Sequence, residues 1–260
     1  MNVLTNKIQP NERRNLHTNL DLRVTGGRRA VALDHHQKRR QLPETMNFKP
    51  FPKMARLRRE CMITEKIDGT NASIYIGAYD PLDSNCIGIQ YTENVPLGMW
   101  VGSRNRWITL ADDNFGFARW AYDHTAELFN LGEGHHFGEW WGSGIQRNYG
   151  FKNGERFFSL FNAGRWVEHD KPTYAIEQDN PKAKPKFTEH APACCKVVPV
   201  IYEGVFDTDC IKMELAALER FGSAAAKGFM NPEGIIVYHK AAGVGFKLTL
   251  DNDDQPKGKQ

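Results

Sequence analysis

One lysine stands where its amine could serve as a nucleophile. The segment Glu-Lys-Ile-Asp-Gly-Thr-Asn at 65–71 places Lys66 at the end of an apolar run and just before an Asp-Gly turn. A strand that ends in a tight turn holds such a side chain on a stiff element at the rim of a cleft. The same short pattern also fits a surface lysine beside an ordinary hairpin turn, so it does not establish a site by itself.

Five further segments rich in charged and aromatic side chains follow Lys66 in order. They are Ser-Arg-Asn-Arg at 103–106, Phe-Gly-Glu-Trp-Trp-Gly at 137–142, Arg-Phe-Phe-Ser-Leu-Phe at 156–161, Glu-Gly-Ile-Ile-Val-Tyr at 233–238 and Phe-Lys-Leu-Thr at 246–249. This collinear series resembles the motifs of covalent nucleotidyltransferases, the class that contains DNA ligases, RNA ligases and capping enzymes. The resemblance covers about residues 46–250.

Within this class the chain most resembles phage-type, ATP-dependent RNA ligases. Thr70 and Asn71 directly follow the Asp-Gly pair, as in the RNA ligase form of the lysine motif. The segment at 138–149 resembles the glutamate motif of these ligases and its extension. Only 13 residues follow Lys247, so we do not expect the oligonucleotide-binding domain that most DNA ligases and capping enzymes append there.

The resemblance implies an enzyme that joins RNA 3′-hydroxyl and 5′-phosphate ends through a lysyl-AMP intermediate and an adenylylated 5′ end. It implies that Lys66 is the nucleophile, and that Arg104 and Lys247 contact phosphates, with Lys247 on the α-phosphate. Glu139 would hold the ribose hydroxyl, and Glu233 would help to bind Mg²⁺ or Mn²⁺ near the reacting phosphate. An ordinary lysine is protonated at pH 7, and nearby positive charge from a divalent ion, Arg104 and Lys247 would favour the free amine.

The resemblance also implies contacts to the base and to the RNA. Phe158 would stack on adenine, with Phe157 as the alternative, because adjacent residues of a strand face opposite sides and the spacing to Phe161 favours Phe158. Glu65 would lie near the adenine edge, mostly through backbone groups. Asn71 would contact the 5′-phosphate of the strand to be joined.

The last motif departs from the family pattern. Many members carry a second lysine two places after the first, and Thr249 occupies that place here. If Lys247 instead corresponds to the second lysine, Gly245 or Phe246 lies where the first should be. Lys240 is a candidate for the missing phosphate contact.

Short strands and two helices must position these residues. Apolar patterns predict strands over 62–67, 72–76, 87–91, 100–102, 136–141, 156–161, 197–202, 234–239 and 245–250. Helical spacing predicts helices over 115–131 and 207–221, and four prolines predict a surface excursion over 163–196. Strands outnumber helices, which indicates an α+β domain with largely antiparallel sheets flanked by helices. The resemblance implies that this is the nucleotidyltransferase (ATP-grasp-like ligase adenylation) fold.

Charge divides the 260-residue chain, whose formal net charge is +3. Residues 1–45 hold nine Lys or Arg against four acidic residues and lack apolar periodicity. We expect a flexible basic arm there, which either attaches to phosphates or is a passive extension. The nucleotidyltransferase domain is expected over 46–250 and a polar tail over 251–260.

Composition excludes several classes of protein. With 40% hydrophobic and 25% charged residues, the chain is neither collagenous, nor a disulfide miniprotein, nor wholly disordered. No apolar run reaches the roughly 18 residues of a membrane span, so no membrane partner is expected. Five cysteines without a Cys-x-x-Cys pair predict reduced thiols in a cytoplasm, that of the host for a phage protein.

Two alternatives to an RNA ligase remain open at this level. A minimal ATP-dependent DNA ligase would share every adenylation residue. A catalytically silent RNA-binding module could keep the fold without the chemistry. The sequence does not indicate an oligomeric state.

Overall fold

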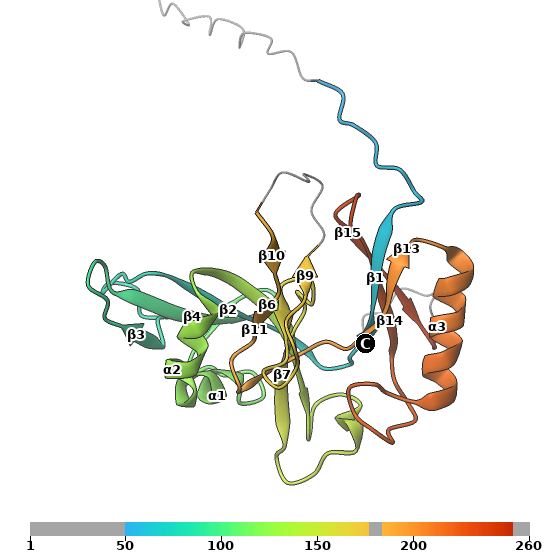
Figure 1. The fold of residues 1–260 in the computed structure, drawn as a ribbon. Coiled ribbons are helices and arrows are strands. Elements are labelled where there is room, and N and C mark those ends of the chain that lie inside the picture. Colours follow the sequence, from blue (N-terminus) through green and yellow to red (C-terminus); the bar gives the residue numbers. More distant parts are fainter. Residues whose placement is uncertain (1–49, 177–183, 252–260) are drawn as a thin grey trace, which may run out of the picture. The chain divides into compact units, whose positions relative to one another are not determined.

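A computed structural model describes residues 50–176 and 184–251 (Figure 1). The chain divides after residue 51, and the second unit comprises residues 52–260. The expected arm at 1–45 lies outside the described residues, as does the expected tail at 251–260 apart from Asp251. The second unit contains all the motifs and is described below.

The described part of the second unit consists mainly of strands. In chain order its elements are β1 (Glu60–Lys66), β2 (Thr70–Ala78), β3 (Gly88–Gln90), β4 (Leu97–Ser103), β5 (Trp107–Ile108), α1 (Phe117–Asp123), α2 (Thr125–Leu128), η1 (Phe129–Leu131), β6 (Gly134–Gly142), η2 (Asn148–Gly150), β7 (Arg156–Leu160), β8 (Trp166–Val167), β9 (Ala175–Ile176), β10 (Lys186–Phe187), β11 (Glu189–His190), β12 (Cys195–Val197), β13 (Val200–Val205), α3 (Thr208–Phe221), β14 (Gly234–His239) and β15 (Val244–Thr249).

A four-stranded antiparallel sheet has the order β13-β1-β14-β15 and carries α3 on one face (Figure 1). Successive residues of a strand point to opposite faces of a sheet, and one face of this sheet is apolar. Cys61, Ile63, Ile235 and Val237 are buried with Ile211 and Leu218 of α3. The opposite face, which carries Lys66, is therefore free of the helix.

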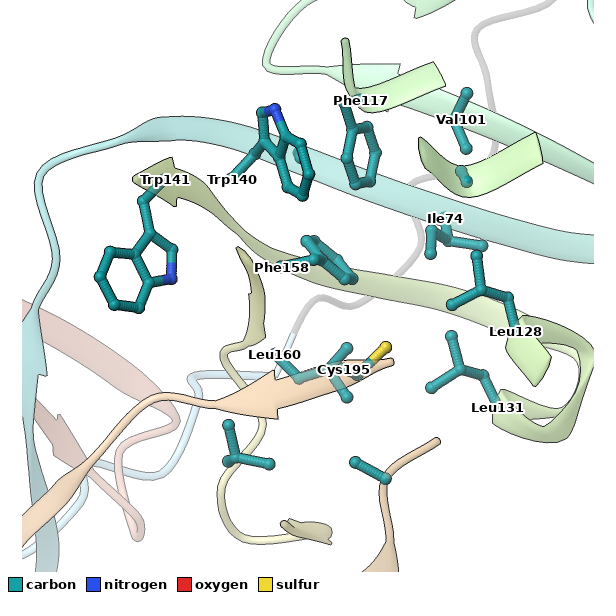
Figure 2. Close-up of a cluster of buried hydrophobic side chains, with 14 of the residues drawn as sticks. Ile74, Val101, Phe117, Leu128, Leu131, Trp140, Trp141, Phe158, Leu160 and Cys195 are labelled. Carbon is teal, nitrogen blue, oxygen red and sulfur yellow. The ribbon is translucent and has the colours of Figure 1, made fainter. Parts of the chain in front are cut away.

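A seven-stranded sheet has the order β12-β7-β6-β2-β4-β3, with β5 paired to β4. Its strands pair antiparallel except for β12 and β7. One face packs on α1, α2 and η1 through a large apolar core that includes Ile74, Phe117, Leu128, Trp140 and Phe158 (Figure 2). The helices thus cover one face and leave the other for the site.

The connection from β1 to β2 crosses from one sheet to the other and is not a hairpin turn. Gly69 lies in this connection, where a Cβ atom would stand 2.5 Å from the Trp140 carbonyl oxygen and 2.8 Å from the Trp141 Cβ. Only glycine therefore allows the chain to pass so close to β6. This crossing places the end of β1, and Lys66 with it, between the two sheets.

The expected fold class is confirmed: the described residues form an α+β unit with largely antiparallel sheets flanked by helices. The single helix expected over 115–131 is wrong, because the chain leaves helical geometry at His124 (φ −108°, ψ 17°). There Thr125 Oγ1 donates to the carbonyl oxygens of Ala121 and Tyr122, at 3.2 and 2.7 Å. The hydroxyl thus competes with backbone amides for these carbonyl oxygens.

The helix expected over 207–221 is confirmed as α3, and Asp207 caps it by accepting from the Asp209 amide. The excursion expected over 163–196 contains the short strands β8 to β11 and the start of β12. None of the helices in the described residues has the length and apolar character needed to cross a membrane.

Candidate active site

A cavity of about 1330 Å³ lies between the inner faces of the two sheets. Six of the residues predicted for the site line it: Glu65, Lys66, Asn71, Arg104, Glu139 and Lys247. The structure therefore brings together residues that are up to 182 positions apart in the chain. Glu233 joins them through a direct contact with Lys66, whereas Phe158 lies elsewhere.

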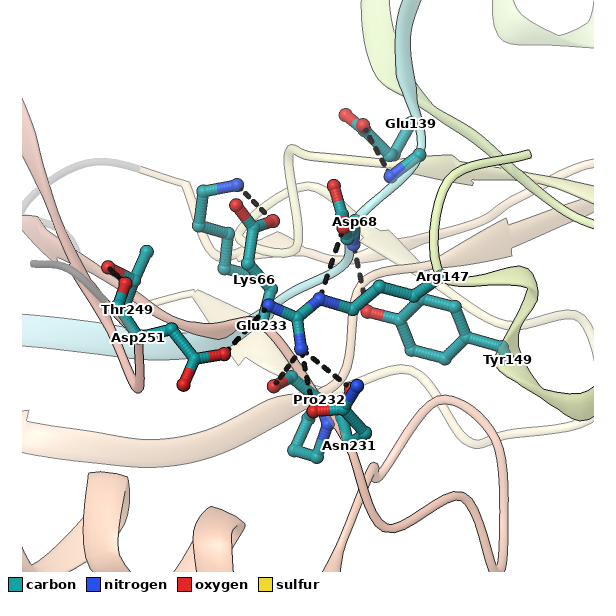
Figure 3. Close-up of polar contacts among 11 residues, drawn as sticks. Lys66, Asp68, Glu139, Arg147, Tyr149, Asn231, Pro232, Glu233, Thr249 and Asp251 are labelled. Carbon is teal, nitrogen blue, oxygen red and sulfur yellow. Dashed lines mark hydrogen bonds and ion pairs between the residues drawn. The ribbon is translucent and has the colours of Figure 1, made fainter. Parts of the chain in front are cut away.

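Lys66 forms an ion pair with Glu233 at the end of β1 (Figure 3). The Lys66 side chain is 21% exposed and that of Glu233 is 3% exposed, so the amine reaches the cavity while its partner lies beneath it. The register pairs Lys66 with Gly234, which places Glu233 beside Lys66. Gly234 has φ +155°, and a Cβ atom there would lie 2.1 Å from the Leu248 carbonyl oxygen, so β14 can start here only with glycine.

Arg147 and Tyr149 hold the connection that follows Lys66 (Figure 3). The Asp68 amide donates to Tyr149 Oη at 2.8 Å, and Arg147 Nε donates to Asp68 Oδ2 at 3.1 Å. Arg147 also donates to Asn231 Oδ1 at 2.8 Å and to Asp251 Oδ2 at 3.3 Å. One guanidinium thus links the lysine loop to both ends of the β14–β15 hairpin.

Around Arg147 the backbone adopts conformations that are rare for residues other than glycine. Gln146, Asn148 and Tyr149 all have positive φ, at 43°, 60° and 48°. Such residues persist only where their surroundings determine the conformation. Burial raises the pKa of Tyr149, which keeps its hydroxyl neutral beside Asp68. The strained loop is therefore held in place by its contacts with the lysine motif.

Glu139 faces the cavity from β6, opposite Asn71 of β2. Its Oε1 accepts from the Gly69 amide at 3.1 Å. Burial raises the pKa of Glu139 to about 7, against the opposing pull of the Lys66 charge and the Gly69 hydrogen bond. Near pH 7 the group therefore exists in both protonated and ionised forms, and its ionised form can accept hydrogen bonds from a ligand that enters the cavity.

Glu139→Gln is expected to change how stability depends on pH. Between about pH 4.5 and 7 the folded protein holds a proton on Glu139 that the unfolded chain releases, so stability falls as pH rises through this range. Glutamine removes this loss. The variant's free energy of unfolding, relative to wild type, should increase by about 1–3 kcal/mol from pH 4.5 to pH 8.

Denaturant unfolding of both proteins across this pH range measures the difference. Glu219→Gln, at an exposed position of α3, is the matched control. A difference between Glu139→Gln and wild type that stays constant with pH would contradict the prediction.

Glu65 lines the cavity only with its backbone side, because its carboxylate points to the opposite face of β1. Oε1 accepts from Ser223 Oγ at 2.7 Å, and Oε2 accepts from the amides of Ala224 and Ala225, both at 2.8 Å. Burial raises the pKa of this carboxyl. The side chain therefore anchors the loop after α3, and any contact of Glu65 with a base must come from the backbone.

The expectation for Phe158 is wrong. Its ring is 0% exposed and packs against Phe117 and Trp120 in the helix-side core, with ring centroids 5.0 and 5.8 Å away. Phe157 is also excluded, since its ring packs on Trp141 and Phe151 and does not line the cavity. The ring of this segment that lines the cavity is Phe161, which is 41% exposed.

The cationic residues lie around the mouth of the cavity. Lys247 is exposed on β15 opposite Ile236, and Arg104 is exposed just after β4. Thr249 pairs with Gly234 and thus lies one step nearer to Lys66 along β15 than Lys247 does. Lys240 follows the last residue of β14, lines the same cavity and forms a 2.5 Å ion pair with Glu203.

Two groups of residues were missed from the sequence. Arg147 and Tyr149 lie in the segment that extends the glutamate motif, but nothing in their spacing indicates that they contact Asp68, 79 and 81 residues away. Phe161 was missed because strand alternation shows that it and Phe158 face opposite sides, yet does not show which side is the cavity.

Comparisons with known proteins return one family match and several structural matches. The sequence model of a family described as RNA ligase matches residues 59–249. Among solved structures, a ligand-free point mutant of Naegleria gruberi RNA ligase R4a has a TM-score of 0.42 and 17% identity over 75% of this chain. A mutant of the Naegleria gruberi RNA ligase with ATP and Mn has a TM-score of 0.41 and 16% identity over 74% of this chain.

The matched region spans about half the length of those two structures, 50% and 49%. No curated protein matches this chain.

Proposed function

The chain belongs to the RNA ligase family, and from this premise we propose that it joins RNA 3′-hydroxyl and 5′-phosphate ends with ATP. The observation that carries the proposal is the placement of Lys66 in a cavity lined by Arg104, Glu139 and Lys247. This arrangement offers a nucleophile, a carboxylate and two cations to one nucleotide. It suits phosphoryl transfer, which depends on positioning and charge neutralisation.

In the first step, the Lys66 amine attacks the α-phosphorus of ATP. The N–P bond forms, the bond to pyrophosphate breaks and the amine loses a proton, which leaves AMP on the lysine. The ion pair with Glu233 must open first, because this contact holds the amine on the carboxylate and away from the phosphate. Lys247 and Arg104, at the mouth of the cavity, would then neutralise charge on the phosphates.

In the following steps, the AMP passes to the RNA 5′-phosphate, and the 3′-hydroxyl attacks this end and releases AMP. Asn71 lies on β2 directly opposite Glu139, so it would contact the 5′-phosphate beside the ribose. The Glu139 carboxylate would accept a hydrogen bond from the ribose hydroxyl. Thr249 stands in register with Gly234, next to Lys66, and many members of the family have a lysine at this place. Because threonine carries no charge, Lys247 makes the α-phosphate contact in this proposal.

The donor set suits a weakly coordinated divalent cation. The described residues contain no group of three His, Cys, Asp or Glu that would form a metal cage. Mg²⁺ is commonly held by one or two carboxylates together with substrate phosphates, and Glu233 meets this requirement beside Lys66. Mg²⁺ or Mn²⁺ bound there would neutralise charge on the reacting phosphate and favour the free amine.

Phe161 replaces Phe158 as the proposed adenine contact. Phe161 reaches the cavity from the seven-stranded sheet, and Ile236 lines it from the four-stranded sheet. A purine between them would stack on the ring. Phe161→Ala should weaken ATP binding about 5- to 150-fold, the equivalent of about 1–3 kcal/mol for one stacked base, and change stability little.

Phe158→Ala is the informative counterpart in the same segment. It should lower the free energy of unfolding by about 3–5 kcal/mol, because it opens a void in the core. Equilibrium binding of a fluorescent ATP analogue and denaturant unfolding separate the two effects. Weaker ATP binding by a folded Phe158→Ala protein, with Phe161→Ala unchanged, would contradict the new assignment.

A strand-joining assay tests the proposed function. The protein is incubated with ATP, Mg²⁺ or Mn²⁺ and 5′-phosphorylated strands that end in RNA or in DNA. Faster joining of RNA ends supports the proposal. Faster sealing of all-DNA nicks indicates a DNA ligase instead, and the absence of any protein-bound AMP indicates a silent RNA-binding module.

A further inference from the structure

A row of aromatic side chains leaves the cavity along the inner face of the seven-stranded sheet. The row consists of Phe161, Phe137, His135, Tyr75 and Trp107. The strand register explains it: Tyr75 of β2 stands opposite His135 of β6, and β5 sets Trp107 opposite Gly102 of β4. The Phe161 amide donates to the Phe137 carbonyl oxygen at 2.9 Å, which makes these two residues neighbours.

The rings of Phe137, His135, Tyr75 and Trp107 are in contact, with interplanar angles between 8° and 42°. The His135 ring lies 5.7 Å from Phe137 with an interplanar angle of 8°, 4.4 Å from Tyr75 at 29°, and 6.3 Å from Trp107 at 16°. Each neighbour holds the next in orientation. These four rings therefore form one contiguous aromatic surface.

This surface is exposed, which is unusual for large apolar rings that lie side by side. Phe137 is 53% exposed and Trp107 is 41% exposed. On the other face of the same sheet, Trp140 of β6 and Phe117 of the covering helix α1 are almost fully and fully buried. Contiguous exposed apolar surface of this kind marks a binding site.

The row is continuous with the nucleotide cavity. His135 and Phe137 line the same cavity as Lys66, and the exposed Arg104 lines it from the end of β4. Stacked aromatic rings beside a cation suit the flat bases and charged backbone of a nucleic acid strand. Bases in a duplex are already stacked and paired, so only unpaired bases can reach these rings.

We propose that the row formed by Phe137, His135, Tyr75 and Trp107 stacks unpaired bases of the RNA end that is being joined, so that the substrate is single-stranded next to the junction. This inference rests on the proposed function, because it assigns a strand to the same cavity. It names the class of RNA end, single-stranded and not a nick within a duplex.

Binding of two fluorescent RNAs tests the proposal. One is a 5′-phosphorylated single strand, and the other is the same strand within a nicked duplex, both without ATP so that no chemistry occurs. Trp107→Ala and Phe137→Ala should each weaken single-strand binding about tenfold and change duplex binding less than about twofold. Both side chains are largely exposed, so their removal leaves no cavity in the core.

Tyr122→Ala is the matched control, an aromatic side chain on α1 that is 48% exposed on the helix-covered side of the sheet. Its binding of both RNAs should equal that of wild type. Unchanged single-strand binding in the row variants, or an equal loss for the duplex, would overturn the inference. Formation of lysyl-AMP by the wild-type protein is measured separately, so failure of the ligase proposal is distinguishable from failure of this one.

Discussion

Lys66→Arg is expected to abolish covalent attachment of AMP, by at least about a thousandfold in rate. Arginine keeps the positive charge and the contact with Glu233, so the fold should be retained. The guanidinium stays protonated and its lone pairs are delocalised, so it does not attack phosphorus. With ATP labelled at the α-phosphate, wild-type protein should keep the label after denaturation, and the variant should not.

Lys212→Arg provides the matched control for this experiment. Lys212 is exposed on α3, which packs on the face of the four-stranded sheet away from the cavity. This variant should become labelled at the wild-type rate. Label on Lys66→Arg protein would assign the nucleophile to another residue.

Glu233→Gln is expected to slow adenylylation about 100- to 1000-fold. Two effects oppose each other. Loss of the ion pair releases Lys66, which favours attack, whereas loss of the carboxylate removes the proposed cation ligand, whose charge stabilisation contributes several kcal/mol. The second effect is larger, so the net result is a loss.

The dependence on divalent cation identifies this cause. If Glu233 holds the cation, the variant should need a higher Mg²⁺ or Mn²⁺ concentration for half its maximal rate, in a labelling assay at matched ATP. Glu168→Gln removes the carboxylate of a surface pair with Lys171 and serves as the control. An unchanged metal requirement in Glu233→Gln would assign Glu233 to positioning Lys66 alone.

Much of the fold was predictable because alternation of apolar residues is a local property. The strands expected over 62–67, 72–76, 136–141 and 234–239 overlap β1, β2, β6 and β14, and the helix expected over 207–221 is α3. The helix over 115–131 failed at Thr125, whose apolar neighbours keep helical spacing while its hydroxyl competes for backbone carbonyls. The spacing of apolar residues carries no information about that competition.

Part of the candidate site was likewise predictable from the sequence, and part was not. The order of the motifs indicated Lys66, Glu139 and Lys247 as neighbours, and the shared cavity brings them together. The brace from Arg147 to Asp68 and the anchoring of the Glu65 carboxylate join residues 79 and about 160 positions apart. Such contacts depend on how loops pack, which no local pattern encodes.

By itself, the sequence determined which residues share a strand face and in what order the chemically active ones occur. The tertiary structure alone decided that β1 and β2 enter different sheets, so that Lys66 lies between them, and that Phe161 and not Phe158 faces the cavity. The physical reason is that the side chains of a strand alternate between its two faces. This alternation shows which residues share a face but not which face other elements cover. That choice is made by the helices, which bury the face that carries Phe158 and leave the other to the ligand.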